Sequence, residues 1–306
     1  MTPAVISIEK ALVLDRRMRA LTGLDGAAFL ELEKRFAVAL AQEQAHQTQA
    51  GAARQRAAGA GRKGMLPSVR AKLFFMLFYL KAYPTQDVMG FFFGLSQPQV
   101  CARVNQLMPV LKRLMQWKLP ARSGHELAQV MAELPEIKEV LIDGTERPIA
   151  RPEHKGRRDR HYSGRRRRTT VKNVLLTAGS QVVLLTETVA GRRHDKSEAE
   201  QARIRLHPSM RVTGDLGFMG YSAGDGQVRT PHRKPPHRPL HWRHRRANRK
   251  LARERVPVEH VMASVKRLGI LRQPLRAKRQ STADLAMLIG CGLHNFRVSR
   301  RTEATN

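Results

Sequence analysis

The sequence predicts an all-helical N-terminal part followed by an α/β domain. Up to about residue 134, apolar side chains recur every three or four positions, the spacing of amphipathic helices. From Pro135 onward, short β-branched runs alternate with helical segments, an order typical of an α/β layer domain. The chain has 306 residues, of which 42% are hydrophobic, so it is long enough for two domains and apolar enough for real cores.

The N-terminal part is expected to contain one helix at about residues 21–45 and a second at residues 66–83. The longest apolar run, residues 73–80, is far shorter than the roughly 20 residues that cross a bilayer, so we expect a buried helix and no membrane partner. Residues 50–64 are rich in Ala, Gly and Arg, which is typical of a flexible basic linker. We assign residues 1–64 to an N-terminal helical region ending in this linker. The apolar side chains at helical spacing in the first helix are Leu24, Phe29, Leu32, Phe36 and Leu40.

Residues 65–134 are predicted to form a DNA-binding domain. Thr85 can cap a short helix that ends at Phe93, Gly94 permits a turn, and Ser96 can cap the next helix. Two short helices joined by a glycine turn are what a helix-turn-helix requires. Any helical hairpin would show the same local pattern, and the basic composition of the chain favours the DNA-binding interpretation.

The second helix of this pair has a predicted apolar face and a predicted polar face. Gln99 follows Ser96 by three residues, the spacing of a capping box. We expect Gln97 and Arg103 to lie nearest the DNA bases. The side chains expected to face inward are Val100, Val104 and Leu107, and those expected to face outward are Gln97, Arg103 and Asn105.

The α/β domain is expected to span residues 135–306. Residues 171–178 and 181–188 are β-branched runs joined by a Gly-Ser pair, which is a hairpin signal. The predicted order is strand, hairpin, helix, strand, basic insert, helix, helix, with the insert at about residues 220–255. The other predicted strands are residues 137–143 and 210–215, and the predicted helices are residues 195–206, 258–271 and 282–299.

The charge of the chain indicates a polyanionic partner. It has 56 Lys and Arg residues against 25 Asp and Glu, a formal net charge of +31. Such self-repulsion favours a nucleic-acid partner over a purely solvated basic surface. Residues 151–172 contain 10 Lys or Arg, and residues 229–255 contain 11. We expect both basic stretches to line a DNA channel and to be poorly ordered without DNA.

RNA binding and export are the less favoured interpretations. Aromatic residues make up 5% of the chain, which gives RNA bases few stacking platforms. The first 20 residues mix acids and bases where a signal peptide has its apolar core, so a cytoplasmic protein is expected.

Three acidic residues stand in unusual places for so basic a chain. Asp143 and Asp215 are each expected to end a strand and to be followed by a glycine turn, and Glu259 is expected to open a helix after Pro257. Singly, such acids are commonly turn residues or favourable charges at a helix N-terminus. Together, carboxylates beside a polyphosphate require a divalent cation, and Mg²⁺ prefers oxygen ligands.

The segments "LIDGTERPIARP", "GDLGFMGY" and "VPVEHVMASVKRLGIL" resemble bacterial insertion-sequence transposases of the DDE superfamily, in the insertion-sequence-five-like group. The resemblance covers nearly the whole chain. It implies an RNase H-like catalytic domain, a mixed sheet with flanking helices, preceded by a helix-turn-helix domain. Matched residue by residue, it implies that Asp143, Asp215 and Glu259 are the catalytic acids and bind two Mg²⁺ ions, with Mn²⁺ able to substitute.

The resemblance also implies residues that position DNA. Arg255 and Lys266 occupy the positions of a basic pair on the family's Glu helix, although the tyrosine that often precedes the arginine is Ala252 here, and Pro257 is expected to interrupt the helix. His194 and Asp195 match a His-Asp pair seen in such proteins, and Asp195 could instead cap a helix. The predicted DNA-binding residues are Gln97, Arg103, Arg165, Arg166, Arg167, Arg168, Arg255 and Lys266.

The function implied by the resemblance is DNA transposition. The enzyme would cleave double-stranded DNA at the element's terminal inverted repeats and transfer the strands into target DNA by in-line phosphoryl transfer. It would act as a homodimer or higher oligomer on DNA, in the bacterial cytoplasm, associated with the nucleoid when bound. The alternative is a catalytically idle, transposase-derived regulator that binds specific DNA sequences.

Overall fold

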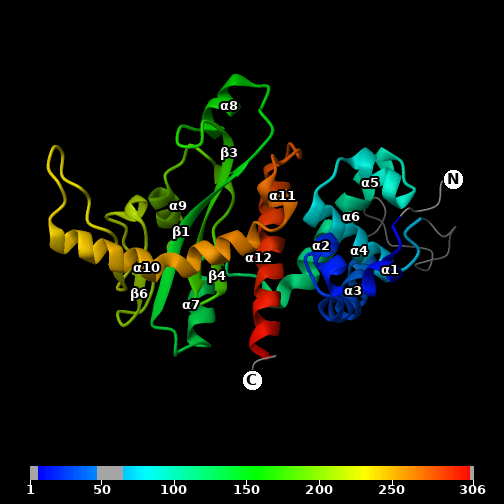
Figure 1. Cartoon of the computed structure of the whole chain (residues 1–306), viewed down its shortest axis with the longest axis horizontal. Coiled ribbons are helices and arrows are strands. Elements are labelled where there is room, and N and C mark those ends of the chain that lie inside the picture. The colour runs from blue at the N-terminus through cyan, green and yellow to red at the C-terminus, as the bar shows by residue number, and fades with distance from the viewer. Residues whose placement is uncertain (1–5, 47–64, 304–306) are drawn as a thin grey trace. The chain divides into compact units, whose positions relative to one another are not determined.

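The computed structural model describes residues 6–46 and 65–303. The chain divides into two compact units (Figure 1), and each is described here by itself. Unit 1 consists of Met1–Trp117 with Arg267–Ile270, and unit 2 of Lys118–Lys266 with Leu271–Asn306. The predicted linker at residues 50–64 lies outside the described residues.

Unit 1 is helical, as predicted. The first predicted helix is divided, because Gly23 adopts a left-handed φ of 82° and ends one helix before the next begins. All five apolar residues predicted to line its core are buried. The run at residues 73–80 is buried as predicted, and Phe74 packs edge-on against Phe29. The helices are α1 Ile8–Leu12, α2 Asp15–Thr22, α3 Gly26–His46, α4 Val69–Ala82, α5 Gln86–Phe93 and α6 Gln97–Met115.

Helices α5 and α6 form the predicted helix-turn-helix. The hydroxyl of Thr85 accepts a hydrogen bond from the Val88 N–H at 3.3 Å, and Gly94 takes a left-handed φ of 65° between the helices. The Ser96 N–H donates to the side-chain oxygen of Gln99 at 2.9 Å, as the capping-box spacing predicts. The predicted inward residues of α6 are buried, and Gln97, Arg103 and Asn105 are exposed.

Unit 2 is built on a mixed seven-stranded sheet in which the strands follow the order β2-β3-β1-β6-β7, with β4 and β5 also paired to β3. β3 is antiparallel to β1, whereas β6 is parallel to both β1 and β7. This confirms the predicted mixed sheet with flanking helices, including the hairpin, in which Gly179 has a φ of 54°. The strands are β1 Glu139–Pro148, β2 Tyr162–Ser163, β3 Arg168–Ala178, β4 Gln181–Leu185, β5 Val189–Ala190, β6 Arg211–Thr213 and β7 Gln227–Arg229.

Helices cover both faces of this sheet. On one face, Val140 and Ile142 of β1 pack with Leu127 of α7 and Ala199 of α9 in one apolar core. On the other, α10 lies across β1 and packs against α12 (Figure 1). The helical elements of this part of the chain are η2 Gln116–Lys118, α7 Gly124–Ala132, α8 Lys155–His161, α9 Asp195–Gln201, η3 Leu216–Phe218, α10 Trp242–Val265, α11 Gly269–Arg272 and α12 Gln280–Glu303.

Two sequence predictions about α10 are wrong. Helix α10 continues through Pro257, so Glu259 lies inside a helix and does not open one. Proline removes one helical hydrogen bond, here to the carbonyl of Arg253. Arg253 and Pro257 are both exposed, so water can satisfy that carbonyl, while the buried Val258 and Val261 anchor the helix to the core. The second basic stretch is therefore largely helical from Trp242 onward.

Three further predictions need correction. β1 continues to Pro148, so Asp143 lies within a strand and does not end it. The first basic stretch, which was expected to be poorly ordered without DNA, contains α8 and the start of β3. α9 ends at Gln201, earlier than predicted, because Arg203 takes a left-handed φ of 49° just beyond it.

Candidate active site

Asp143 and Asp215 lie side by side because of the register of two parallel strands. The pairing of β1 with β6 ends where Leu141 faces Thr213. Asp143 and Asp215 each follow two residues later, so both carboxylates lie where β6 has ended while β1 continues. Asp215 begins the turn η3, and its Oδ1 accepts a hydrogen bond from the Gly217 N–H at 2.8 Å.

Asp143 is a partly buried carboxylate whose pKa is raised to about 6. Burial is the main cause of the shift, and the neighbouring carboxylates of Asp215 and Asp195 add to it, while Arg255 and the Gly144 N–H oppose it. The Arg255 guanidinium lies 3.5 Å from Oδ1 of Asp143, and the Gly144 N–H donates to the same oxygen at 3.0 Å. Asp143 is thus held among like charges with one cation in contact.

Asp195 is the third aspartate at this place. It is the first residue of α9 and not its N-cap, which is His194, so the alternative prediction of a helix-capping role is wrong. A Cβ on Gly144 would lie 2.5 Å from the carboxylate carbon of Asp195, so only glycine allows this approach to β1. A Cβ on Gly217 would lie 2.9 Å from Asp215 Oδ1 and 3.8 Å from Asp195 Oδ2. Both glycines that follow the predicted acids therefore border Asp195.

Helix α10 places Arg255 and Lys266 near the aspartates, whereas the Glu259 side chain has no hydrogen-bond or ion-pair partner among the described residues. Successive helical residues turn by about 100°, so Arg255 and Glu259 lie on one side of α10, and Lys266, the residue directly after the helix, continues that side. Lys266 is largely buried; burial lowers its pKa, Arg166 and Arg147 lower it further, and Asp143 and Glu146 oppose the shift. Glu259 is exposed and makes no hydrogen bond or ion pair among the described residues.

A buried ion-pair network beside the aspartates was missed by sequence reasoning. Lys172, counted in the first basic stretch, has a side chain only 8% exposed and does not line a DNA channel. Its Nζ lies 3.0 Å from Asp195 Oδ1 and 3.5 Å from Glu146 Oε1, and it donates to the Arg193 carbonyl at 2.8 Å. Glu146 and Lys172 face each other across β1 and β3. The hairpin pattern could have suggested burial of Lys172, because most residues of the run 171–178 are apolar.

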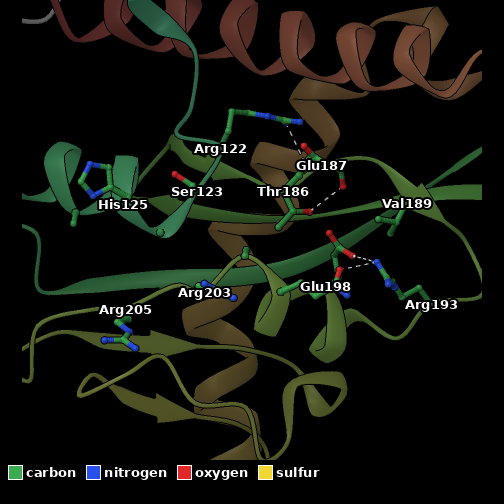
Figure 2. A pocket seen from close by; sticks show the side chains of 14 residues that line it. Arg122, Ser123, His125, Thr186, Glu187, Val189, Arg193, Glu198, Arg203 and Arg205 are labelled. Carbon is green, nitrogen blue, oxygen red and sulfur yellow. Dashed lines mark hydrogen bonds and ion pairs between the residues drawn. The ribbon is translucent and has the colours of Figure 1, made fainter.

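A cavity of ≈ 730 Å³ borders the far end of α9 (Figure 2). It lies apart from the three aspartates, none of which lines it. Arg193 points at the buried Glu198 in its wall, 3.3 Å away, and donates to Gln201 at 2.8 Å. These contacts fasten α9 to the loop before it and so fix where Asp195 begins the helix.

The predicted DNA-binding arginines at residues 165–168 are exposed: the first three lie in the turn between β2 and β3, and Arg168 begins β3. None of the four side chains makes a hydrogen bond or ion pair in the part of the chain that the structure describes. Arg166 lowers the pKa of Lys266, which places it within electrostatic reach of the site. In unit 1, Arg103 donates to Gln106 at 2.7 Å and Gln97 contacts Gln86, and both lie on the exposed face of α6.

The donor chemistry of the site fits a hard divalent cation. The carboxylates of Asp143, Asp195 and Asp215 are oxygen donors, and Asp195 Oδ1 is buried without a hydrogen bond. Among the residues with described positions, no three His, Cys, Asp or Glu side chains are grouped closely enough to hold a metal ion. Arg255, 3.5 Å from Asp143 Oδ1, would compete with a cation for that carboxylate.

The comparisons with known proteins match both units. A model of the DDE superfamily endonucleases matches residues 142–295, and a model of the helix-turn-helix of DDE superfamily endonucleases matches residues 65–116. The chain is 28% identical over 223 residues to a probable transposase for insertion sequence element IS702 from Microchaete diplosiphon, covering 72% of this chain and 78% of that protein. No solved structure matches. Among the described helices, none is long and apolar enough to cross a membrane.

Proposed function

The chain belongs to the DDE superfamily of endonucleases, and from this premise we propose that it is a DNA transposase that cuts DNA at the ends of an insertion sequence and joins them to target DNA. One observation carries the proposal: the parallel register of β1 and β6 sets Asp143 beside Asp215 inside the matched catalytic region. The relative's printed name supports the same function.

The site residues have distinct proposed roles. Asp143 and Asp215 would hold divalent metal, with Glu259 reaching from α10 as the third predicted acid. Two Mg²⁺ ions, when bound, would activate the attacking oxygen and stabilise the leaving oxygen of an in-line displacement. Arg255 would release Asp143 when the cation arrives, and it would then be free to contact a DNA phosphate together with Lys266.

The remaining proposed roles concern DNA. The exposed face of α6, with Gln97 and Arg103, would read the terminal inverted repeats in the major groove. Arg165, Arg166, Arg167 and Arg168 would hold phosphates near the site, because their side chains are exposed and make no hydrogen bond or ion pair to any described residue. A homodimer or larger assembly would bring the two element ends together.

The test is cleavage of a supercoiled plasmid that carries the element's own ends, incubated with the protein with and without Mg²⁺. We expect Mg²⁺-dependent nicks at the end sequences and none in a plasmid with scrambled ends. Specific binding without any cutting would contradict the proposal and favour a transposase-derived regulator.

A further inference from the structure

We propose that the start of helix α10 and the loop before it bind unpaired bases of single-stranded DNA, with Trp242 as the side chain on which a base stacks. This segment, residues 230–250, is called the basic arm. The inference rests on the proposed function for the source of the unpaired strand, which is the DNA end that cleavage frees. It adds a binding site that contains none of the predicted acids.

Four aromatic rings gather at the start of α10. The rings of His232 and His244 stack with their centroids 4.0 Å apart. The centroid of the His241 ring lies 6.0 Å from that of His244 and 5.8 Å from that of Trp242. The aromatic fraction of 5% counts only Phe, Trp and Tyr, so it leaves these histidines out. The basic arm therefore carries a group of rings that the composition did not indicate.

These rings are not part of a hydrophobic core. All four side chains are exposed, and the Trp242 side chain is 55% exposed. The Arg243 guanidinium lies 5.4 Å from the centroid of the Trp242 ring, so a ring that can stack on a base stands beside a cation that can bind a phosphate. Rings that contribute nothing to a core remain available to a ligand.

Specific hydrogen bonds hold the basic arm in shape. The side-chain oxygen of Asn248 accepts the His232 N–H at 2.8 Å, and its side-chain nitrogen donates to the His232 carbonyl at 3.0 Å. The His241 ring accepts the Arg243 N–H at 3.3 Å and so caps α10. Trp242 is thus presented by a capped helix start, and rings held in place lose less conformational entropy when they bind a ligand.

The cations of the basic arm are not neutralised by acids of the protein. Residues 230–250 contain eight Lys or Arg and no Asp or Glu. Lys250 lies 4.0 Å from Glu254, and the other seven make no ion pair with any described residue. Such cations attract the phosphates of any DNA, so a preference for one form must come from the rings. The eight cations are Arg233, Lys234, Arg238, Arg243, Arg245, Arg246, Arg249 and Lys250.

Exposed rings favour unpaired bases over duplex DNA. The grooves of a duplex present base edges, because the base faces are stacked on one another. An unpaired base offers its faces to Trp, His or Arg side chains. Trp242 precedes Arg255, which contacts Asp143, by 13 residues (255 − 242) of the same helix, or about 20 Å along its axis (Figure 1). A strand freed at Asp143 would therefore reach the basic arm after several nucleotides.

The first measurement is the tryptophan fluorescence of the full-length protein in EDTA. The chain has two tryptophans, so the variant Trp117→Phe keeps Trp242 alone. An oligonucleotide of about 12 nucleotides is added either as a single strand or annealed to its complement. We expect the single strand to quench the fluorescence, because a base stacked on an indole quenches it, and the duplex to leave it nearly unchanged. This measurement needs no substitution at Trp242.

The second measurement is affinity, followed by the fluorescence anisotropy of the labelled oligonucleotide. Trp242→Ala should weaken single-strand binding by about 5-fold or more, the scale of one lost base stack, and leave duplex binding unchanged. Trp242→Phe should retain most of the single-strand affinity, because it keeps an aromatic ring. The matched control Arg249→Ala removes a cation from the same helix and should weaken binding of both forms alike.

Equal quenching by both forms, or an equal loss of affinity for both forms in Trp242→Ala, would overturn the inference, because Trp242 would then belong to a general duplex-binding surface. Unchanged single-strand affinity in Trp242→Ala would overturn it as well. These assays contain no divalent metal and involve no cleavage. A protein that binds single strands through Trp242 but cuts no plasmid would therefore refute the proposed function alone.

Discussion

Two of the acid-arginine pairs in unit 2, Asp284 with Arg122 and Asp143 with Arg255, differ in how many hydrogen bonds the acid accepts. Asp284 accepts two hydrogen bonds from Arg122, both at 2.8 Å, and two more from the N–H and hydroxyl of Thr188 at 2.8 and 2.9 Å. Asp143 has Arg255 at 3.5 Å and its neighbour's N–H at 3.0 Å. The first acid is held entirely by the protein, whereas the second is buried beside other acids with few donors.

This difference separates a structural carboxylate from a functional one. A carboxylate that already accepts four hydrogen bonds has little to gain from a metal ion, and removing it leaves its donors unpaired. A carboxylate with weak partners and like charges around it gains most from a cation. The contrast predicts that equivalent substitutions at the two acids have opposite effects on stability and unequal effects on catalysis.

The largest expected effect is the loss of DNA cleavage in Asp143→Asn. The substitution keeps the shape of the side chain but removes a charged metal ligand, so the cleavage rate should fall by about 10³-fold or more, equivalent to several kcal/mol. Plasmid nicking in Mg²⁺ measures the rate, and a gel-shift assay should show unchanged DNA binding. Wild-type cutting by this variant would show that Asp143 is not a metal ligand.

The same contrast, between side chains held by protein contacts and side chains available to bind DNA, applies to the arginines. Arg122 is held by Asp284, whereas the side chains at residues 165–168 make no hydrogen bond or ion pair with the residues that the structure describes. Changing Arg165, Arg166, Arg167 and Arg168 together to Ala should weaken binding to all duplex sequences alike. The slope of log K against log salt should lose about 0.9 in magnitude for each phosphate contact removed. An unchanged slope in a folded variant would mean that this turn is only a solvated surface.

The sequence predicted the parts of this site that depend on local pattern. Asp143 and Asp215 follow short β-branched runs, and the resemblance named both of them. The approach of Asp195 could not be predicted, because it depends on how α9 packs on β1 and on the absence of a side chain at Gly144. The glycine itself suggested a turn, yet it lies within a strand.

Burial and long-range packing explain the other errors. Lys172 was counted with the DNA-facing cations, because sequence alone does not distinguish a lysine buried between two acids from one in solvent. Pro257 was expected to interrupt the helix, because the low helix propensity of proline can be read from the sequence. The packing of Val258 and Val261, which holds the helix on the core, cannot. Where pattern and packing agreed, as in α5 and α6, the predicted caps and buried faces were confirmed.

Asp284→Asn should destabilise the fold while leaving Mn²⁺ affinity unchanged. The substitution removes the charge that Arg122 faces and turns an amide N–H₂ toward groups that are themselves donors. We expect a loss of about 2–3 kcal/mol in the free energy of unfolding, below the value for a fully buried pair because both side chains are about a quarter exposed. Urea unfolding measures it. If this variant is as stable as the wild-type protein, Asp284 is not a structural carboxylate and the comparison with Asp143 fails.

The smallest expected effect concerns the stability of the poorly satisfied acid itself: Asp143→Asn should stabilise the metal-free protein at neutral pH. The pKa of Asp143 is raised from 3.8 to about 6 in the folded chain, so between these values the unfolded chain ionises first and the wild-type fold loses stability as pH rises. Asparagine does not titrate, so the variant avoids this loss. Its advantage should be absent near pH 3.5, grow through pH 4–6 and reach about 1–3 kcal/mol above pH 6.

Thermal melting in EDTA across this range measures the difference in stability between the variant and the wild-type protein. Added Mg²⁺ should reduce or reverse the advantage, because it binds the wild-type carboxylate. A variant that melts below the wild-type protein at pH 7.5 in EDTA would show that Asp143 is satisfied by Arg255, as Asp284 is by Arg122.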